Sequence, residues 1–484
     1  MASVREETAR GVKWGLIQKC TMQPVQFLFG IILARLISPE EMGILALTGI
    51  FFAFAGQLQE CGFGAALIRK QERTDEDICT VFWFNVTMSF LLSLALFLAA
   101  PCFVWFFDQP ALLNLTRVSA LLMFLNSTGS VHWTLYQARR DFKTPAIVSM
   151  CTTLVAMPFT IWAALAGWSY WAPMLQGIVT GLLGLITVWI ISPWKPRFRF
   201  SPSSFKEFFR FGANLALTGI LMQFYSEIRT FIIGKFYSPA QLAYFSKAQQ
   251  TCSMPLNLMY GIMNPVTYPI LSTLQHDHSR LIHVYRQYTR ITALIAEWGM
   301  VTLAANAPSL IVTLYGESWK TTAIYAQILC FGWMINPMLG LNMNLCTIQG
   351  RTDLNLRFEM ILRCVSIGVM VWCAFYSVRA LCYAAVFSSF FGFIVSCIMV
   401  TRISELRISH IAEDSLPYLI IALLSNIPAY IINLQAWPSY YQLSAGVVLS
   451  IVIFSILLLI KKDSTAATLL SFVRNKYFNR MKSS

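Results

Sequence analysis

The chain has 484 residues, of which 57% are hydrophobic and only 12% are charged, and its net charge is +14. Because a soluble protein carries about 25% charged residues, these numbers exclude a soluble multidomain enzyme and a disordered chain. The long apolar runs also exclude a transmembrane β-barrel, whose strands alternate over about ten residues, and they predict an all-α polytopic membrane protein.

Apolar segments long enough to cross a bilayer follow one another along the chain. A spanning helix needs roughly 20 mostly apolar residues, and charged or turn-forming residues separate fourteen such segments. The segments are 12–34, 42–67, 79–106, 113–136, 145–166, 171–192, 208–234, 242–273, 288–314, 322–348, 357–377, 380–401, 416–434 and 441–460. The connections between them are short, which leaves no room for an extramembrane catalytic domain.

The basic residues favour one orientation in the membrane, because cytoplasmic loops carry an excess of Lys and Arg. If the N-terminus is cytoplasmic, 28 of the 36 cations lie in cytoplasmic loops or at the helix ends beside them. Of the others, four lie in outside loops and four lie inside spans. This alternation predicts an even number of spans and two cytoplasmic termini.

The two halves of the chain repeat one another at an offset of 200 residues. Arg10 then aligns with Arg210, and the stretch 31–39 aligns with 231–239, which also ends in Ser-Pro. Proline is favoured in the first turn of a helix, so each Ser-Pro is predicted to open the next helix. Since the offset covers six spans, we expect two parallel six-helix lobes around a central cleft, an architecture found in transporters.

This organisation divides the chain into five parts. The N-terminal lobe is predicted at 1–192 and the C-terminal lobe at 207–402, with a basic cytoplasmic linker at 193–206 between them. Two appended helices follow at 403–460. The basic segment 461–484 is amphipathic and is predicted to lie on the anionic inner surface of the membrane.

Ionisable side chains inside the spans mark the candidate site, because such groups are costly in a membrane and usually face a cavity or a partner. Three cations, Lys19, Arg229 and Lys247, are predicted to line the cleft and to bind an anionic head group. Lys and Arg suit this role since they donate charge-assisted hydrogen bonds to phosphate. The fourth cation, Arg117, lies near the outer boundary and is expected to snorkel to water.

Alternative roles remain open for several of these residues. Snorkelling competes with the cleft role for Lys247, and a structural ion pair between Lys19 and Glu60 on adjacent helices competes with phosphate binding. The acids Glu60, Glu227 and Glu297 are candidates for coupling transport to an H+ or Na+ gradient, with a purely structural role as the alternative.

No catalytic or metal-binding pattern stands out. The sequence contains no Walker motif, no HExxH and no GxSxG, and its 12 Cys residues form no CxxC and no repeated spacing. Most of the Cys residues lie in apolar segments, where they are expected to act as small apolar filler. We therefore expect neither an enzyme nor a metal or cofactor site, and the cations mark membrane topology instead of nucleic-acid binding.

Five stretches resemble one protein family. They are LARLISPEEMGILAL (33–47), GFGAALIRKQERTDEDICTVFWFN (62–85), RRDFKTPAI (139–147), IIGKFYSPAQLAYFSKAQQ (232–250) and ILCFGWMINPMLGLNMNLCTIQGRTDLNLRFE (328–359). Together they resemble the Wzx-type polysaccharide flippases, in particular the colanic-acid and lipopolysaccharide exporter branch of the multidrug/oligosaccharidyl-lipid/polysaccharide exporter superfamily. The resemblance covers about residues 5–460.

The resemblance implies a fold of twelve core helices in two lobes plus two appended helices. It also implies the movement of an undecaprenyl-diphosphate-linked oligosaccharide from the inner to the outer leaflet of the bacterial inner membrane, in a pathway with glycosyltransferases and a polymerase. Lys19 stands where relatives commonly have Arg, Glu60 where they have an acid, and Lys247 where the residue is usually basic. Lys keeps the charge at these positions but lacks the bidentate geometry of Arg.

Two other members of the superfamily are the alternatives. A cation-coupled multidrug exporter should have an anionic cleft, and the basic residues within the spans argue against it. A peptidoglycan-precursor lipid flippase shares the fold and the need for cations, so charge alone does not separate it from a polysaccharide flippase.

Overall fold

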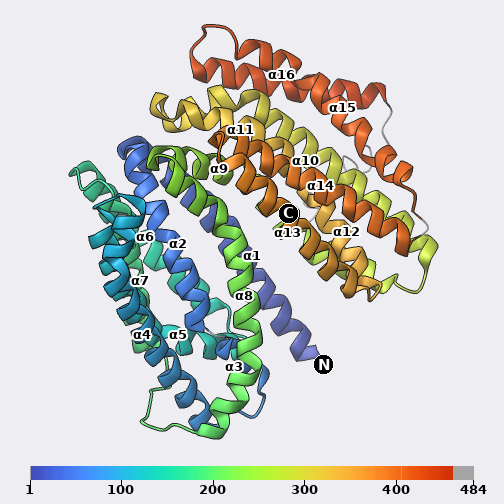
Figure 1. Ribbon diagram of the computed structural model, residues 1–484. Coiled ribbons are helices and arrows are strands. Elements are labelled where there is room, and N and C mark those ends of the chain that lie inside the picture. Colours follow the sequence, from blue (N-terminus) through green and yellow to red (C-terminus); the bar gives the residue numbers. More distant parts are fainter. Residues whose placement is uncertain (1, 61, 405, 462–484) are drawn as a thin grey trace, which may run out of the picture. The chain divides into compact units, whose positions relative to one another are not determined.

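The computed structural model of the protein, shown in Figure 1, describes residues 2–60, 62–404 and 406–461. Every regular element in those ranges is helical. The elements are α1 (Ala2–Leu36), α2 (Pro39–Glu60), α3 (Phe63–Arg69), α4 (Asp75–Phe107), α5 (Leu112–Ala138), α6 (Lys143–Leu165), α7 (Trp171–Ile191), α8 (Pro202–Phe236), α9 (Pro239–Thr273), α10 (His278–Tyr315), the 3-10 turn η1 (Glu317–Trp319), α11 (Lys320–Trp333), α12 (Asn336–Ile348), α13 (Thr352–Ala374), α14 (Val378–Ile403), α15 (Ile408–Ile432) and α16 (Ser439–Ile460). The predicted all-α class is confirmed, and residues 462–484 of the predicted amphipathic tail lie outside the described ranges.

The helices overlap the predicted spans one to one when α2 with α3, and α11 with α12, are each counted as one segment, although α1, α10 and α15 begin eight to ten residues before the spans predicted for them. Among the described residues, nine segments are long and apolar enough to cross a membrane. The helices that do not meet this criterion are α1, α5, α8, α9 and α13. The chain is therefore a multi-pass helical membrane protein, and the total of fourteen spans stays a prediction.

Two predicted spans are each divided into two helices, one at a glycine and one just before a proline. Gly62, which precedes α3, has a φ of +66°, a left-handed conformation that glycine adopts without steric cost. Between α11 and α12 the helix is broken at Met334 and Ile335, just before Pro337, whose ring nitrogen has no hydrogen to donate to the helix. Local backbone chemistry therefore divides what hydropathy alone presents as continuous.

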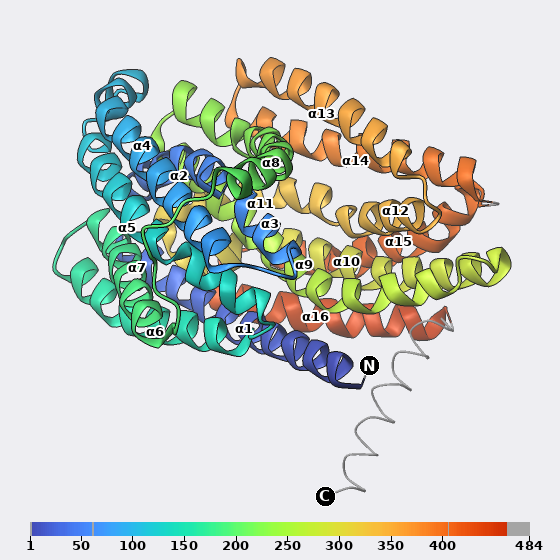
Figure 2. The same cartoon turned by 90° about the horizontal axis from the view of Figure 1, so that it is seen from below.

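The helices form two compact units, Met1–Ala243 and Tyr244–Ser484. In the first unit α4 packs on α5, and α6 on α7 (Figure 2). The helix α8 packs on α2, α3 and α4, so it belongs to the first unit, although the repeat places it at the start of the predicted lobe 207–402. The linker 193–206 thus separates the two sequence repeats. The division between the compact units lies inside α9 instead. The lobe boundaries stay a prediction that rests on the repeat.

The helix ends follow the internal repeat. Both α1 and α8 have 35 residues and end at Leu36 and Phe236, and α2 and α9 both begin with the predicted prolines. The Ser38 hydroxyl accepts a hydrogen bond from the Glu41 N–H (3.3 Å), and the Ser238 hydroxyl accepts one from the Gln241 N–H (3.4 Å). Each Ser-Pro therefore opens a helix, as predicted, and its serine also caps that helix.

The basic linker is bound to the start of α4. The indole N–H of Trp194 donates to Asp75 (3.0 Å), the indole N–H of Trp83 donates to the carbonyl of Arg197 (2.9 Å), and the N–H of Ser201 donates to the hydroxyl of Thr80 (2.9 Å). These bonds involve side chains along about two turns of α4, so the linker is a strap that holds α8 against the first unit.

Lys70, at the end of α3, reinforces this end of the first unit. Its ammonium lies 3.0 Å from Asp77 of α4 and 3.2 Å from Glu207 of α8. Burial lowers the pKa of Lys70, but the hydrogen bonds from its ammonium to the two carboxylates outweigh burial and raise the pKa above its usual value. The ammonium is therefore a fixed charge that joins three helices.

In the second unit the appended helices α15 and α16 pack on each other and on α10 (Figure 1). At one end of this contact the buried carboxylate of Asp414 accepts hydrogen bonds from Arg286 (2.6 and 3.0 Å) and Arg290 (2.6 Å) of α10. Glu413 also reaches Arg286, at 3.3 Å, but is 61% exposed. Asp414 therefore joins α15 to α10 through two arginines.

We expect Asp414→Ala to destabilise the second unit by about 2–4 kcal/mol, because it leaves two partly buried guanidinium groups without their carboxylate. The matched change at the neighbouring exposed acid, Glu413→Ala, should cost less than about 0.5 kcal/mol. Thermal unfolding of the purified full chain in detergent measures both. Equal losses in the two variants would show that Asp414 does not hold α15 in place.

Candidate functional site

The first predicted cleft residues lie on α1 and α2. The helical positions of Lys19 and Glu60 are described, but their side chains lie outside the described residues. Two neighbours of Lys19 on α1, Gly15 and Gln18, line a large cavity in the first unit. The backbone position of Lys19 is therefore next to this cavity, whereas the alternative of a Lys19–Glu60 ion pair stays open.

The charged pair on α8 also belongs to the first unit. Glu227 accepts a hydrogen bond from the side-chain amide of Gln223 (3.1 Å), one helical turn before it. Gln223 in turn lines a smaller cavity of about 320 Å³, together with Gln57 and Gln59 of α2. Arg229 is half-buried two residues after Glu227, so the two charges lie on different faces of α8.

Lys247 lies on α9 in the second unit. Its ammonium is 5.7 Å from the centroid of the Tyr315 ring and 3.3 Å from the side-chain oxygen of Gln250. The residue is half-buried. These contacts hold the cation close to its own helix and to the end of α10, and the choice between binding substrate and snorkelling remains a prediction.

Glu297 is fully enclosed in the second unit. It is 2% exposed, and its Oε1 accepts a hydrogen bond from the hydroxyl of Ser415 on α15 (2.9 Å). Its second oxygen has no hydrogen-bond partner among the described residues. The carboxyl therefore lies in the contact between α10 and the appended helix α15.

The largest cavity described in the first unit has a volume of about 890 Å³, and its described lining includes none of the site residues predicted from the sequence. Helices α1 and α3–α7 surround it, and it is lined by glycines, amides, hydroxyls and apolar side chains. Its polar lining consists of Gln18, Asn85, Asn126, Ser130, Trp133, Thr134, Gln137, Ser149, Thr152 and Thr180. Charged residues within the spans do not reveal this cavity, because none is part of its described lining. Uncharged polar residues within apolar runs are the sequence feature that could have indicated it.

Asn85 and Ser130 line both cavities of the first unit, so the two cavities adjoin at these residues. The Asn85 amide donates to the Ser130 hydroxyl (3.4 Å). The Asn85 carbonyl oxygen is buried and has no hydrogen-bond partner among the described residues. These two residues therefore lie between a larger cavity that α1 borders and a smaller one that α2 and α8 border.

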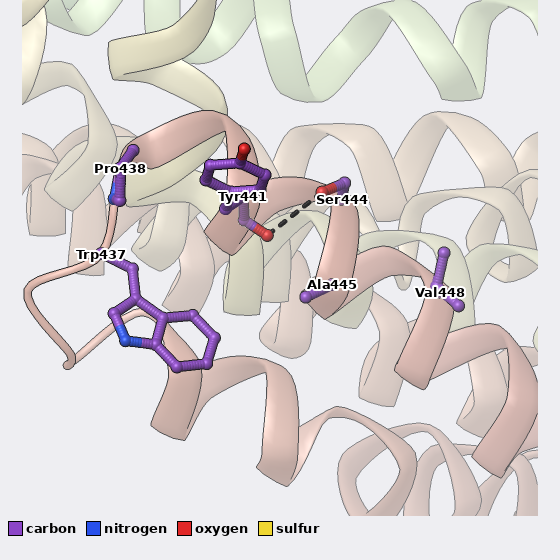
Figure 3. A pocket seen from close by; sticks show the side chains of 6 residues that line it. All are labelled: Trp437, Pro438, Tyr441, Ser444, Ala445 and Val448. Carbon is purple, nitrogen blue, oxygen red and sulfur yellow. Dashed lines mark hydrogen bonds between the residues drawn. The ribbon is translucent and has the colours of Figure 1, made fainter.

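A further cavity of about 400 Å³ opens on the second unit at the start of α16 (Figure 3). It is lined by Trp437, Pro438, Tyr441, Ser444, Ala445 and Val448, and the Ser444 hydroxyl donates to the carbonyl of Tyr441 (3.1 Å). Trp437 and Tyr441 are 53% and 57% exposed. Exposed Trp and Tyr at the end of a span are typical of the membrane–water interface, so this cavity is a surface feature and not a polar site.

Among the described residues, no group of three or more His, Cys, Asp or Glu side chains is arranged to hold a metal ion.

The family described as "Polysaccharide biosynthesis protein" matches residues 32–324, more than half of the chain. The chain belongs to this family. The match confirms the family resemblance inferred from the sequence, and the family consists of membrane transport proteins of polysaccharide biosynthesis.

Curated members of the family are similar along most of the chain. The succinoglycan biosynthesis transport protein ExoT of Rhizobium meliloti is 24% identical and covers 96% of this chain and 95% of its own length. The teichuronic acid biosynthesis protein TuaB of Bacillus subtilis is 21% identical over 73% of this chain and 74% of its own. The lipopolysaccharide biosynthesis protein WzxC of Escherichia coli is 20% identical over 74% and 73%.

Two solved structures of transport proteins share the fold of this chain. The lipid II flippase MurJ in an inward closed conformation aligns with a TM-score of 0.69 at 14% identity, covering 95% of this chain and 98% of its own. An inward-facing multidrug transporter of the MATE family aligns with a TM-score of 0.59 at 16% identity, covering 80% and 98%. At these identities the likeness concerns the fold alone.

Proposed function

We propose that the chain is a flippase that moves undecaprenyl-diphosphate-linked oligosaccharide repeat units from the inner to the outer leaflet of the bacterial inner membrane by alternating access. The product would serve the synthesis of an O-antigen, a capsule or an exopolysaccharide. The observation that carries this proposal is the similarity to a succinoglycan biosynthesis transport protein over 96% of the chain. The transporter fold supports it independently.

The chemistry of the substrate fits the polar residues within the spans. The diphosphate needs cations, for which Lys19, Arg229 and Lys247 are the candidates. The sugars need uncharged hydrogen-bonding groups, and the polyprenyl tail can stay in the bilayer. The reaction breaks no covalent bond, so we assign no catalytic residue and propose that the chain is not an enzyme.

Several finer features belong to the same proposal. Both termini are cytoplasmic, following the distribution of cations. Glu60, Glu227 and Glu297 are the candidates for H+ or Na+ coupling, and of these Glu297 faces the appended helix α15 through Ser415. Glycosyltransferases supply the substrate and a polymerase consumes it, so these enzymes of the same pathway are the expected partners.

The lining of the two cavities argues against the multidrug-exporter alternative. A site for cationic drugs needs carboxylates, and none occurs among the lining residues that the structure describes. The peptidoglycan-precursor alternative shares the fold of MurJ. It differs from our proposal in its consequence for the cell, because loss of a lipid II flippase stops cell-wall growth.

Deletion of the gene tests the proposal. We expect lipid-linked repeat units to accumulate in the inner leaflet and surface polysaccharide to disappear, while cells keep growing; the plasmid-borne gene should restore export. The leaflet is measured by the access of a membrane-impermeant sugar-oxidising label in intact cells and in inverted vesicles. Drug sensitivity without accumulation would support the drug exporter, and lysis with accumulated lipid II would support the other rival; both results contradict our proposal.

A further inference from the structure

The large cavity of the first unit has a lining that suits an uncharged, hydroxyl-rich ligand. Its volume of about 890 Å³ is within the range of roughly 300–1,000 Å³ that is usual for small-molecule sites. Among the lining residues that the structure describes, none is Asp, Glu, Lys, Arg or His. The hydrogen-bonding groups are amides and hydroxyls, with the indole of Trp133 beside them.

This lining disfavours other occupants. A diphosphate would need cations and a cationic drug would need carboxylates to offset the loss of hydration. A polyprenyl chain would be opposed by the lining amides of Gln18, Asn126 and Gln137, which would lose hydrogen bonds to water. The hydroxyls of Ser130, Thr134 and Thr152 oppose it less, because they already donate to carbonyls of their own helices. A sugar ring offers hydroxyl groups to the amides and an apolar face to an aromatic ring, so it matches both kinds of lining group.

Two lining groups lack hydrogen-bond partners within the described part of the chain. Asn85 is 6% exposed, and its carbonyl oxygen is unpaired although its amide donates to Ser130. The hydroxyl of Thr180 on α7 is buried and also unpaired. An unsatisfied polar group is costly inside a membrane protein. Both atoms are covered by their neighbours, so a hydroxyl-bearing ligand in the cavity would pair with them once their side chains rotate toward it.

Two glycines of the cavity wall let its helices approach each other, and a third borders free space. A Cβ added at Gly181 would lie 2.9 Å from the amide of Asn126, and one added at Gly129 would lie 3.2 Å from Leu185, so these glycines allow α5 and α7 to approach. Gly184 also lines the cavity, but a Cβ at this position would meet no atom within 4 Å. The space beside Gly184 is therefore available to a ligand.

We propose that this cavity is a subsite for an uncharged sugar residue of the lipid-linked oligosaccharide. The inference rests on the proposed function and adds to it where the sugar binds. On α1 the lining residues Gly15 and Gln18 are close neighbours of Lys19, the predicted phosphate-binding position. Phosphate and sugar sites then follow one another along α1, as they do in the substrate.

Binding to the purified full chain in lipid nanodiscs tests the subsite. Two probes are compared: lipid-linked repeat units extracted from cells that lack the gene, and undecaprenyl diphosphate without sugar. The wild-type chain should bind the glycosylated lipid at least about tenfold more tightly. Gly184→Leu fills the cavity, so it should abolish this difference and leave the affinity for undecaprenyl diphosphate unchanged.

Gly177→Leu is the matched control. Gly177 lies on the same helix and also has room for a Cβ, but it is exposed and is not part of the described cavity lining. It should bind both probes as the wild type does. Equal melting temperatures of the two leucine variants would confirm that Gly184→Leu is folded.

Thr180→Val provides a second test that does not depend on filling space. It removes the unpaired hydroxyl and keeps the shape of the side chain, so no described hydrogen bond within the protein is lost. We expect a loss of about 2- to 10-fold in affinity for the glycosylated lipid only, the value of one neutral hydrogen bond.

The outcomes separate the subsite from the proposed function. If wild type prefers the glycosylated lipid and neither Gly184→Leu nor Thr180→Val reduces that preference, the sugar binds elsewhere and the cavity holds only water. If the wild type does not distinguish the two probes, or binds neither, the proposed substrate itself is wrong. Weaker binding of both probes by Gly184→Leu would also overturn the subsite, because a sugar site should leave the diphosphate contacts intact.

Discussion

Lys19→Glu should abolish glycan export while the protein still inserts into the membrane in normal amounts. The reversal replaces an attraction for the substrate diphosphate by a repulsion, within a span where water screens charges poorly. Export falls to the level of the gene deletion, measured as surface polysaccharide per cell with the membrane content of the chain determined by immunoblot. Normal export by this variant would remove Lys19 from the mechanism.

Two further variants at the same position separate charge from geometry. Lys19→Arg keeps the charge and adds bidentate donors, so it should export at least as well as the wild type. Lys19→Gln keeps a hydrogen-bond donor without the charge and should lose most of the export. If Lys19→Gln were fully active, a hydrogen bond would be sufficient and the electrostatic account of phosphate binding would be wrong.

The double variant Lys19→Glu with Glu60→Lys distinguishes phosphate binding from a structural ion pair. An ion pair between α1 and α2 survives the exchange of its two charges, so a structural role predicts that export returns. Phosphate binding requires the cation at position 19 itself and predicts that the double variant stays inactive. This experiment therefore decides between the two roles of Lys19.

Among the described glycines of the first unit, Gly43 is the one at which an added methyl group is expected to have the largest structural effect, so Gly43→Ala should destabilise the unit. A Cβ at Gly43 would lie 1.8 Å from the backbone oxygen of Pro239 and 2.3 Å from its carbonyl carbon. Because these are backbone atoms at the start of α9, they cannot rotate away, and α2 must move from α9. Overpacking of this kind costs about 3 kcal/mol or more.

The matched control is Gly49→Ala on the same helix. Gly49 is exposed and a Cβ there meets no atom within 4 Å, so the substitution should be neutral or stabilise α2 by up to about 1 kcal/mol. Folded full-length protein is measured by size-exclusion chromatography in detergent, and its stability by thermal unfolding. Similar behaviour of the two alanine variants would show that α2 and the start of α9 do not touch at Gly43.

The elements that sequence predicted correctly depend on neighbouring residues. Long apolar runs specify helices, and the Ser-Pro at 38–39 and 238–239 specifies a cap and a first turn through local hydrogen bonds. The same local reasoning found the repeat, which the equal 35-residue lengths of α1 and α8 reproduce. The offset of 200 residues does not hold along the whole repeat. The corresponding helices α6 (Lys143–Leu165) and α13 (Thr352–Ala374) are both 23 residues long, but they begin more than 200 residues apart.

The features that sequence missed depend on which helices meet. The packing of α8 on α2, α3 and α4 cannot be derived from hydropathy, which is the same whichever lobe receives the helix. The polar cavity combines residues such as Gln18, Asn85, Trp133 and Thr180 from four helices, none of them charged. A search for charges found Glu297, yet only the structure shows that Ser415 of an appended helix is its partner.

The strap at 193–206 bears on where foreign sequence can be inserted. By composition this basic, proline-containing stretch is an obvious place for a fluorescent reporter or a protease site. Its ties to Asp75, Thr80 and Trp83 mean that an insertion would instead break contacts that position α8. Insertion tolerance follows the exposure and bonding of the backbone, so the exposed turn at 275–276 between α9 and α10, ahead of the capping residue Asp277, is the better position for a tag.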